Sequence, residues 1–268
     1  MAEWSGKSSS LSMQQWADWL ASPLGQYLLS VEAHWFCNTM ENQYGYTAIQ
    51  LGTTQVNLLA TCKIRQRILA GQGQGVHVVA DPLNMPFASS SVDVLVLPHV
   101  LDFSADPHQV LREAQRVLVP EGRILISGFN PFSLWGARRW LGKRNIPWAG
   151  NFIRLPRVKD WLSLLNFRIR TSAMGAYIPP SKQRQWQKRF MRLESAGDRW
   201  WPGLGAIYFL EATKQVYGMR LTGLLERQGI RQTRPSRLKL VTGKHELPVS
   251  RLISEQFSPQ DTTLSPDE

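Results

Sequence analysis

The sequence predicts an α/β domain in which helices cover both faces of a mostly parallel sheet. From residue 47 onward, short runs rich in β-branched residues alternate with helical stretches. Runs such as VDVLVL at 92–97 are continuously apolar, which is typical of strands buried on both faces of a parallel sheet. The chain has 268 residues, which allows one domain of about 200 residues with appended segments.

The strands and the clearest helix can be located from these patterns. DPHQVLREAQRVL has Asp106 as a fitting N-cap and Pro107 at the first helical position, and the PEG sequence at 120–122 is expected to end this helix.

Two strand-helix-strand crossovers need about 60 residues. Thr47 to Ala80 spans only 34, so one crossover must be shortened or missing. The expected strands are Thr47–Leu51, Ile64–Leu69, Val76–Ala80, Val92–Leu97, Arg123–Ser127, Phe167–Ser172 and Ala206–Thr213.

Four segments are expected along the chain. Residues 1–12 are polar and predicted to be disordered, and residues 13–45 carry amphipathic helices that Ser22-Pro23 divides, because proline suits a first helical turn. The α/β domain is expected at 46–215. Residues 216–268 are basic, poor in large apolar side chains and predicted to be largely disordered.

The positive charge is concentrated in the second half of the chain. Residues 1–130 carry 7 Lys and Arg against 10 Asp and Glu, a net charge of −3, whereas residues 131–268 carry 24 against 10, a net charge of +14. Such a half suits RNA, another polyanion or an anionic membrane surface, or it is simply a basic soluble surface without a specific partner.

Several classes of protein are not indicated. No run of about 18 apolar residues predicts a transmembrane helix, and the start of the chain has no signal region, so a cytoplasmic protein is expected. Cys37 and Cys62 have no partners at metal-ligand spacing, so neither a metal site nor a disulfide framework is expected. The oligomeric state is not indicated.

The loops that follow the strands carry the candidate site. In an open parallel sheet, ligands bind at the carboxyl ends of the strands, near the point where the strand order reverses. Four of the expected strands are followed by loop segments. These are the segment that starts at Gly52, DPLNMPF at 81–87, PHVLDF at 98–103 and GFNPFSLWG at 128–136. We expect these four segments to line one crevice.

The middle of the chain resembles a known family. The run VVADPLNMPFASSSVDVLVLPHVLDFSADPHQVLREAQRVLVPEGRILISGFNP, Val78 to Pro131, is similar to class I S-adenosylmethionine-dependent methyltransferases of the type 11 group. The shared elements are an acid, a short LPF-like box, an aspartate that opens the fourth strand, and a helix ending in R-x-L-x-P-x-G. GFNPFSLWG and DWLSLLNF resemble a bacterial subgroup of that family. The resemblance implies a Rossmann-like methyltransferase fold and S-adenosylmethionine as cofactor.

The resemblance also implies roles for individual residues. Asp81 would accept a hydrogen bond from the adenine amino group, although Asp and Pro also open turns. His99 would lie beside the transferred methyl group and could act as a general base, or it is a hydrogen-bonded structural histidine. The residues implied as cofactor contacts are Gln50, Gly52, Asp81, Pro82, Leu83, Leu97, Pro98 and His99.

Three polar residues near these loops have simpler interpretations as well. Asn130, just after the fifth strand, could orient a substrate through its amide, but Asn-Pro is also an ordinary turn signal. Asp93 is expected to bond nearby backbone at the edge of its strand. Asp102 is expected to cap a turn.

The sequence departs from the family pattern after the first strand. The family carries a G-x-G-x-G turn there, where backbone passes close to the cofactor, whereas this chain has Gly52-Thr53-Thr54-Gln55-Val56 with one glycine. The glycines at 71, 73 and 75 precede a strand and are interpreted as a connector. No acid follows the second strand. Two hypotheses remain: an S-adenosylmethionine-dependent methyltransferase of unknown acceptor, or a catalytically inactive methyltransferase-like binding or regulatory protein that contacts RNA through its basic half.

Overall fold

The computed structural model describes residues 15–41, 43–53, 55–72, 75–140, 148, 150–179 and 203–216. These residues belong to one compact unit within Met1–Gly218. Residues 15–20 are helical. The following elements are α2 Pro23–Met40, β1 Thr47–Leu51, β2 Gln66–Gly71, β3 Val78–Val79, β4 Val92–Pro98, α3 Val100–Phe103, α4 Pro107–Val117, β5 Leu118–Phe129, α5 Leu134–Trp140, α6 Leu155–Leu164, β6 Phe167–Gly175 and β7 Ile207–Lys214.

The seven strands form one sheet in the order β3-β2-β1-β4-β5-β7-β6. The first five strands in this order are parallel, and β7 runs antiparallel to both of its neighbours, β5 and β6. The central strands β1 and β4 are almost wholly buried, as their continuous apolar sequences require. The predicted fold class is confirmed.

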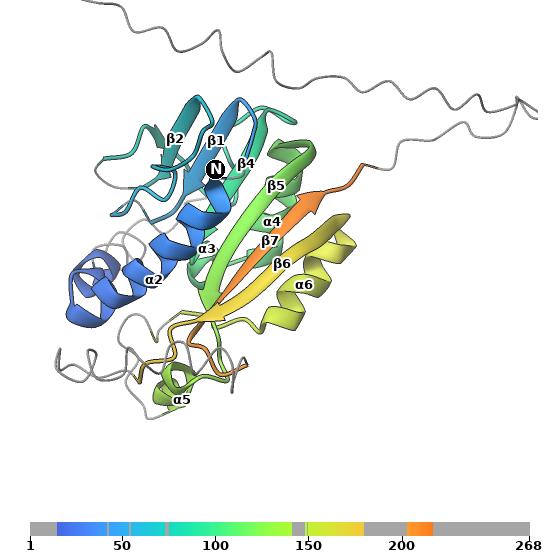
Figure 1. Ribbon diagram of the computed structural model, residues 1–268. Helices are drawn as coiled ribbons and strands as arrows, with labels where there is room; N and C mark the ends of the chain where they lie inside the picture. The colour runs from blue at the N-terminus through green and yellow to red at the C-terminus, as the bar shows by residue number, and fades with distance from the viewer. Residues whose placement is uncertain are drawn as a thin grey trace, which may run out of the picture. The chain divides into compact units, whose positions relative to one another are not determined.

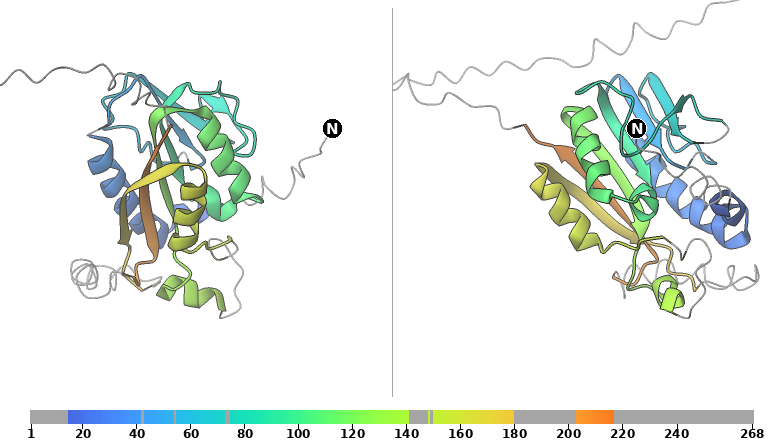
Figure 2. Two further views of the ribbon diagram at one scale, coloured as in Figure 1. Left: turned by 90° about the vertical axis from the view of Figure 1, so that its right-hand side faces the viewer. Right: turned by 180° about the vertical axis from the view of Figure 1, so that it is seen from behind.

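Helices cover both faces of the sheet, as the two side views in Figure 2 show. Helix α2 lies against one face (Figure 1), where its apolar residues pack in a cluster with Phe129, Ile207 and Phe209. Helices α4 and α6 cover the other face, and their apolar residues pack against Leu95 and Leu210. The sheet therefore has a hydrophobic core on each side.

Two helix starts follow from their capping residues. The Ser22 hydroxyl accepts a hydrogen bond from Gly25 N at 3.2 Å, and Pro23 occupies the first turn of α2. The Asp106 carboxylate accepts one from Gln109 N at 3.1 Å, and Pro107 opens α4. Both arrangements satisfy amide groups that have no partner within the helix. The cap at Asp106 and the helix start at Pro23 were predicted, whereas the capping role of Ser22 was not.

The connections in the first half of the sheet differ from the predicted alternation. No helix occurs between β1 and β2, or between β2 and β3, within the residues that the structure describes there (52–53, 55–65, 72 and 75–77). Both crossovers are therefore reduced, where the chain length predicted one. Leu58 and Leu59 from the first of these loops join the cluster around α2. Together with α2 they cover the sheet face without a crossover helix.

Some boundaries also differ from the prediction. The PEG sequence does not end α4, which already ends at Val117; Pro120–Gly122 lies within β5. The chain can enter the strand early because β5 pairs with β4 from Leu118 onward, with a register shift between Val92 and Val94 that takes up the extra residues. The strand predicted at Val76–Ala80 is shorter, Val78–Val79.

In the described part of the chain, no helix combines the length and apolar character needed to cross a membrane. The predicted disordered segment 1–12 and nearly all of the predicted tail, from 217 onward, lie outside the described residues. The predicted division of the chain at residues 46 and 215 stays a prediction.

Candidate functional site

A pocket lies at the carboxyl ends of β1 and β4, where the strand order reverses. β1 pairs with β2 on one side and with β4 on the other, so the connections from β1 and β4 leave the sheet in opposite directions. The pocket is lined by Trp16, Gly52, Thr53, Gly71, Gln72, Ala80, Asp81, Pro82, Leu83, Pro98, His99, Val100, Phe103, Ser104 and Ala105.

Most of the residues implied as cofactor contacts meet at this pocket. Those that line it are Gly52, Asp81, Pro82, Leu83, Pro98 and His99. Gln50 and Leu97 are fully buried and do not line it. Three of the four predicted loops therefore converge, while the roles of the individual residues stay predictions.

The single glycine after β1 is required by close packing. Gly52 has a φ of +106°, and a Cβ at this position would lie 2.7 Å from Val100 Cγ2. Its amide donates to the carbonyl oxygen of Ala70 at 3.0 Å. The neighbouring strand also ends in glycine, because a Cβ on Gly71 would lie 3.0 Å from the Gly52 carbonyl oxygen. The two glycines allow two backbone segments and the start of α3 to approach one another at the pocket.

Gln50 holds the loop that follows Gly52. Its amide nitrogen donates to the carbonyl oxygens of Thr53 at 2.5 Å and Val56 at 2.8 Å, and its Oε1 accepts from Leu58 N at 2.9 Å. The amide is therefore used by the protein itself. This buried side chain gives a loop without a helix the partners that its backbone needs.

Asp81 opens a turn, as its sequence Asp-Pro predicts, and it also lines the pocket. Its Oδ1 accepts from Leu83 N at 3.0 Å, and Asn84 N donates to the Asp81 carbonyl oxygen at 3.1 Å. The side chain nevertheless lines the pocket. Turn formation and ligand binding are thus compatible at this residue.

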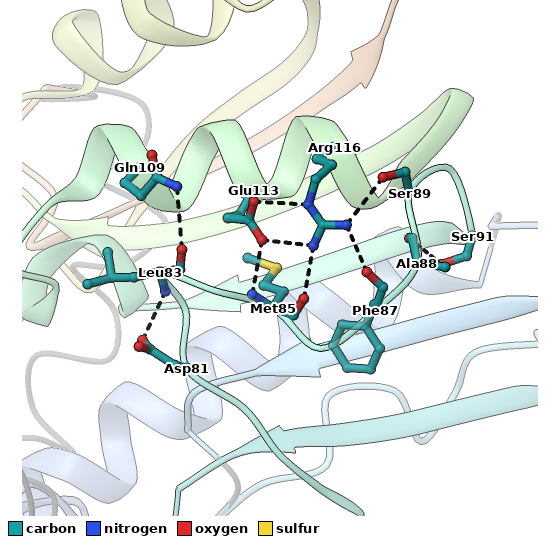
Figure 3. A network of polar contacts seen from close by, with 10 residues as sticks. All are labelled: Asp81, Leu83, Met85, Phe87, Ala88, Ser89, Ser91, Gln109, Glu113 and Arg116. Carbon is teal, nitrogen blue, oxygen red and sulfur yellow. Dashed lines mark hydrogen bonds and ion pairs between the residues drawn. The ribbon is translucent and has the colours of Figure 1, made fainter. Parts of the chain in front are cut away.

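The loop that carries Asp81 is fastened to α4, as Figure 3 shows. Arg116 donates to the carbonyl oxygens of Met85 and Phe87, both at 2.9 Å, and Glu113 Oε2 accepts from Met85 N at 3.0 Å. Glu113 and Arg116 also pair with each other, Nη2 to Oε2 at 2.8 Å. Hydrogen bonding to Arg116 lowers the pKa of the Glu113 carboxyl. This network gives a physical reason for the joint occurrence of the LPF-like box, Met85-Pro86-Phe87, and Arg116 near the end of α4.

His99 is buried between two carboxylates. The residue is 1% exposed and has a φ of +55°. Its Nδ1 lies 2.8 Å from Asp102 Oδ2, and its Nε2 lies 3.1 Å from Glu32 Oε1. Ser127 Oγ donates to the same Glu32 oxygen at 2.5 Å, and Phe129 N donates to Asp102 Oδ2 at 3.0 Å.

The neighbouring carboxyl groups of Glu32 and Asp102 determine the charge of His99. Burial alone would lower the pKa of the imidazole, but the charge of Glu32 and the hydrogen bond to Asp102 outweigh it and raise the pKa to about 9. Burial raises the pKa of the Asp102 carboxyl despite its pairing with His99. His99 is thus protonated near neutral pH, and a protonated imidazole cannot accept a further proton. The general-base role stays a prediction, and this geometry favours a positioning role.

The network around His99 does not have the form of a metal site. In the described residues, no group of three or more His, Cys, Asp or Glu side chains is arranged to hold a metal ion. Asp102 does more than cap a turn, because it joins α3 to His99 and to β5. The expectation for Asp93 is confirmed, since its carboxylate accepts from Tyr46 N and Thr47 N, both at 2.9 Å.

Asn130 lies outside the pocket lining and is buried. Its amide nitrogen donates to the carbonyl oxygens of Gly203 at 2.9 Å and Gly205 at 3.0 Å, and its Oδ1 accepts from Phe132 N at 3.1 Å. These bonds hold the turn after β5 against the segment that precedes β7. The substrate-orienting role of Asn130 stays a prediction, and its amide already has protein partners.

Trp16, Gln72 and Ser104 also line the pocket and were not anticipated from the sequence. Trp16 reaches the pocket from the first helical segment, and its Nε1 donates to Thr53 Oγ1 at 3.0 Å. Gln72 directly follows β2 and lines the pocket, at the place where the family pattern has an acid. Ser104 Oγ is buried at the pocket without a hydrogen-bond partner among the described residues. Only Gln72 had a signal in the sequence, its position just after a strand.

Comparisons with known proteins agree with this architecture. Residues 34–126 match a family model described as a methyltransferase domain. The chain is 35% identical over 205 residues to the uncharacterized protein YafS of Escherichia coli K12, an alignment that covers 72% of this chain and 82% of YafS.

Two solved structures share the fold. An S-adenosylmethionine-dependent methyltransferase from Thermotoga maritima has a TM-score of 0.50 at 16% identity, over 68% of this chain and 92% of that one. A Haloferax volcanii protein solved in complex with a methyltransferase activator has a TM-score of 0.55 at 15% identity, over 77% and 99%.

The two kinds of comparison carry different weight. At these identities the structures show a shared fold only, whereas the family model and the extended match to YafS show common family membership. The prediction of a methyltransferase that uses S-adenosylmethionine is confirmed at the level of the family, and the methyl acceptor is not identified. The chain belongs to the methyltransferase-domain (type 11) family of class I S-adenosylmethionine-dependent methyltransferases.

Proposed function

We propose that this chain binds S-adenosylmethionine in the pocket between β1 and β4 and transfers its methyl group to an acceptor. The supporting observation is the convergence of Gly52, Asp81 and His99 on one pocket, although they belong to loops that follow different strands. These loops meet at the switch point of the sheet, where doubly wound folds bind their ligands. Metal ions have no part in this proposal.

The residues at the pocket fit such a cofactor in two respects. Gly52 and Gly71 line the pocket where two strands end, so that backbone and not a side chain would face a ligand there. The unpartnered Ser104 hydroxyl gives the pocket a buried polar atom, and such an atom gains from a ligand partner.

Residues at different parts of the pocket would hold different parts of the cofactor. Asp81 and Leu83 would hold the adenine ring, because a carboxylate accepts from an exocyclic amino group. Gln72 would bond the sugar hydroxyls in place of the family's acid, since an amide can both donate and accept. Pro98 and His99 would lie beside the methionine part.

The chain contributes positioning more than acid–base chemistry. When bound, S-adenosylmethionine supplies an electrophilic methyl group. His99 is held by Glu32 and Asp102, so it keeps the wall of the pocket in place and its proton stays on the ring near neutral pH. Trp16 and Phe103 place aromatic rings in the lining of the same pocket. Orientation of the acceptor then accounts for most of the rate enhancement.

Calorimetric titration with S-adenosylmethionine tests the proposal directly. We expect saturable binding, together with a rise in the melting temperature at saturating ligand, because a ligand that binds only the folded state stabilises it. Asp81→Ala should weaken binding at least about tenfold, the loss of one charge-assisted hydrogen bond. Asp160→Ala, an exposed acid on α6, should not. Absence of both binding and stabilisation at millimolar ligand would favour the catalytically inactive alternative.

We also propose, from charge alone, that the second half of the chain contacts a polyanion such as RNA. A second, separate proposal is that the protein works in the bacterial cytoplasm. The net charge of +14 over residues 131–268 supports the first point, and the similarity to YafS of Escherichia coli supports a bacterial origin. Filter binding with a 30-nucleotide RNA should show affinity that falls steeply as salt is raised. Salt-independent or undetectable binding would contradict the polyanion proposal.

A further inference from the structure

One end of the pocket is aromatic. Trp16 is 4% exposed, and the hydrogen bond from its Nε1 to Thr53 Oγ1 fixes the orientation of its indole ring. The centroid of this ring lies 4.8 Å from that of Phe103 and 5.6 Å from that of His99. All four residues line the pocket. A ligand group that enters this end therefore meets an indole ring held in one orientation.

The charge around the pocket is not positive, although the chain carries a net charge of +11. Among the described residues, the lining contains no lysine or arginine, and Asp81 is its one acid. His99 contributes a positive charge, but the carboxylates of Glu32 and Asp102 flank it at 3.1 and 2.8 Å. His99 is therefore not an isolated positive charge at the wall of the pocket. In the described residues, the lining presents one acid and no lysine or arginine to a cationic group.

We propose that Trp16 binds the sulfonium centre of S-adenosylmethionine and that Glu32, His99 and Asp102 position the wall beside it, so that the pocket prefers the methyl donor to S-adenosylhomocysteine. The inference rests on the proposed function. Tryptophan is the best of the aromatic side chains at binding a cation over its ring, and the contact strengthens when water is excluded. Trp16 is a binding residue, and the three buried groups act through the shape of the wall.

Methyl transfer would remove the property that this site recognises. The lone pair of the acceptor forms the new bond to the methyl carbon, and the electron pair of the broken carbon–sulfur bond returns to sulfur. The cationic sulfonium thereby becomes a neutral thioether, while adenine, sugar and amino-acid contacts are unchanged. The product is then held more weakly than the donor, which favours its exchange for a new donor molecule.

The ratio of two dissociation constants tests the inference. Calorimetry gives the dissociation constants of S-adenosylhomocysteine and S-adenosylmethionine for the wild type, Trp16→Leu, Trp16→Phe and Trp35→Leu. Contacts common to both ligands cancel in the ratio, so it reports recognition of the methyl-bearing cation. Trp35 is a matched control, because it is partly buried and stacks on Phe209 at 4.7 Å but does not line the pocket.

We expect the wild type to bind S-adenosylmethionine more tightly, and Trp16→Leu to lower that preference by about 2- to 30-fold, the range of a cation–π contact. Trp16→Phe, which keeps a ring with a weaker π face, should give an intermediate ratio and covers the case in which the leucine variant does not fold. Trp35→Leu should leave the ratio unchanged.

Three results would count against the inference in distinguishable ways. A wild type that binds S-adenosylhomocysteine as tightly as the donor overturns it. So does an unchanged ratio in the folded Trp16 variants. In both cases the proposed function survives, since both ligands bind. If the wild type binds neither ligand, the proposed function fails and this inference fails with it.

Discussion

The guanidinium of Arg116 donates to the backbone carbonyl oxygen of Met85 at 2.9 Å, so helix α4 and the loop after β3 are joined. The same guanidinium bonds Phe87 and Glu113. The loop contributes Asp81, Pro82 and Leu83 to the pocket. A residue on the outer helix therefore controls the shape of one end of the candidate site.

Arg116→Met is expected to lower the free energy of unfolding by about 1–3 kcal/mol, because it leaves carbonyl groups and the Glu113 carboxylate without their donor. It should also weaken binding of S-adenosylmethionine, because the loop that carries Asp81 loses its anchor. Urea denaturation and calorimetry measure the two effects. Arg112→Met, an exposed position on the same helix, is the control. Equal affinities in the two variants would show that the loop keeps its shape without Arg116.

Gly52→Ala is expected to lower the free energy of unfolding by about 2–5 kcal/mol, since it combines an unfavourable φ with overpacking against Val100. Gly75→Ala separates the two causes. Gly75 also has a positive φ, +79°, but a Cβ there has no atom within 4 Å. It should cost only the backbone strain. Similar losses in the two variants by thermal or urea denaturation would mean that the contact with Val100 relaxes easily.

Gln50→Leu is expected to lower the free energy of unfolding by about 2–4 kcal/mol, because it removes three hydrogen bonds to the loop after β1 and leaves buried backbone groups without partners. Amide hydrogen exchange should speed up at Leu58, whose N–H donates to Gln50. Gln66→Leu, at an exposed position on β2, is the control. Unchanged protection at Leu58 would show that other contacts order this loop.

The stability of the protein is expected to fall as the pH rises from about 6.5 to 9. The folded state raises the pKa of His99 from 6.5 to about 9, so it holds a proton that the unfolded state has already released. Stabilisation is complete below pH 6.5 and is lost as the pH passes through 9, a change of about 3 kcal/mol for this group. The raised pKa of the Asp102 carboxyl acts in the same direction, from its usual acid range upward.

Denaturation curves of the wild type and His99→Gln across this pH range isolate the contribution of His99. The difference in free energy of unfolding between the two proteins should shrink as the pH rises, because the wild type alone loses the imidazolium. Glu32, Asp102 and the Ser127 hydroxyl surround the ring, and they remain in both proteins. Parallel curves would show that His99 is not protonated in the folded state.

Local sequence patterns were sufficient for the strands and for the starts of α2 and α4. Capping by Ser22 and Asp106 involves side chains within three residues of the amides that they bind. Strand β1 was located at its observed bounds, and the other strands differ mainly at their ends. Apolar runs and caps are readable because their physical causes lie within a few neighbouring residues.

The connections between β1 and β3 are where the sequence patterns predicted the structure least well, because these loops contain no helix in the described residues. The short span between β1 and β3 indicated one reduced crossover, and both are reduced in the described residues. What covers the sheet there is α2, an element that precedes β1, together with Leu58 and Leu59. The sequence of the loop itself does not indicate that α2, which lies elsewhere in the chain, covers this face of the sheet in place of a crossover helix.

The sequence by itself determined the fold class, the family and the convergence of Gly52, Asp81 and His99 at the carboxyl ends of the strands, because strand and loop positions follow from short-range patterns and the family from the motifs between Val78 and Pro131. The tertiary structure decided what those residues do. Glu32 and Asp102 hold His99 as a buried cation, and Trp16 closes the pocket over Thr53. Charge and burial depend on neighbours that packing brings from distant parts of the chain, and these neighbours leave no periodic signal in the sequence.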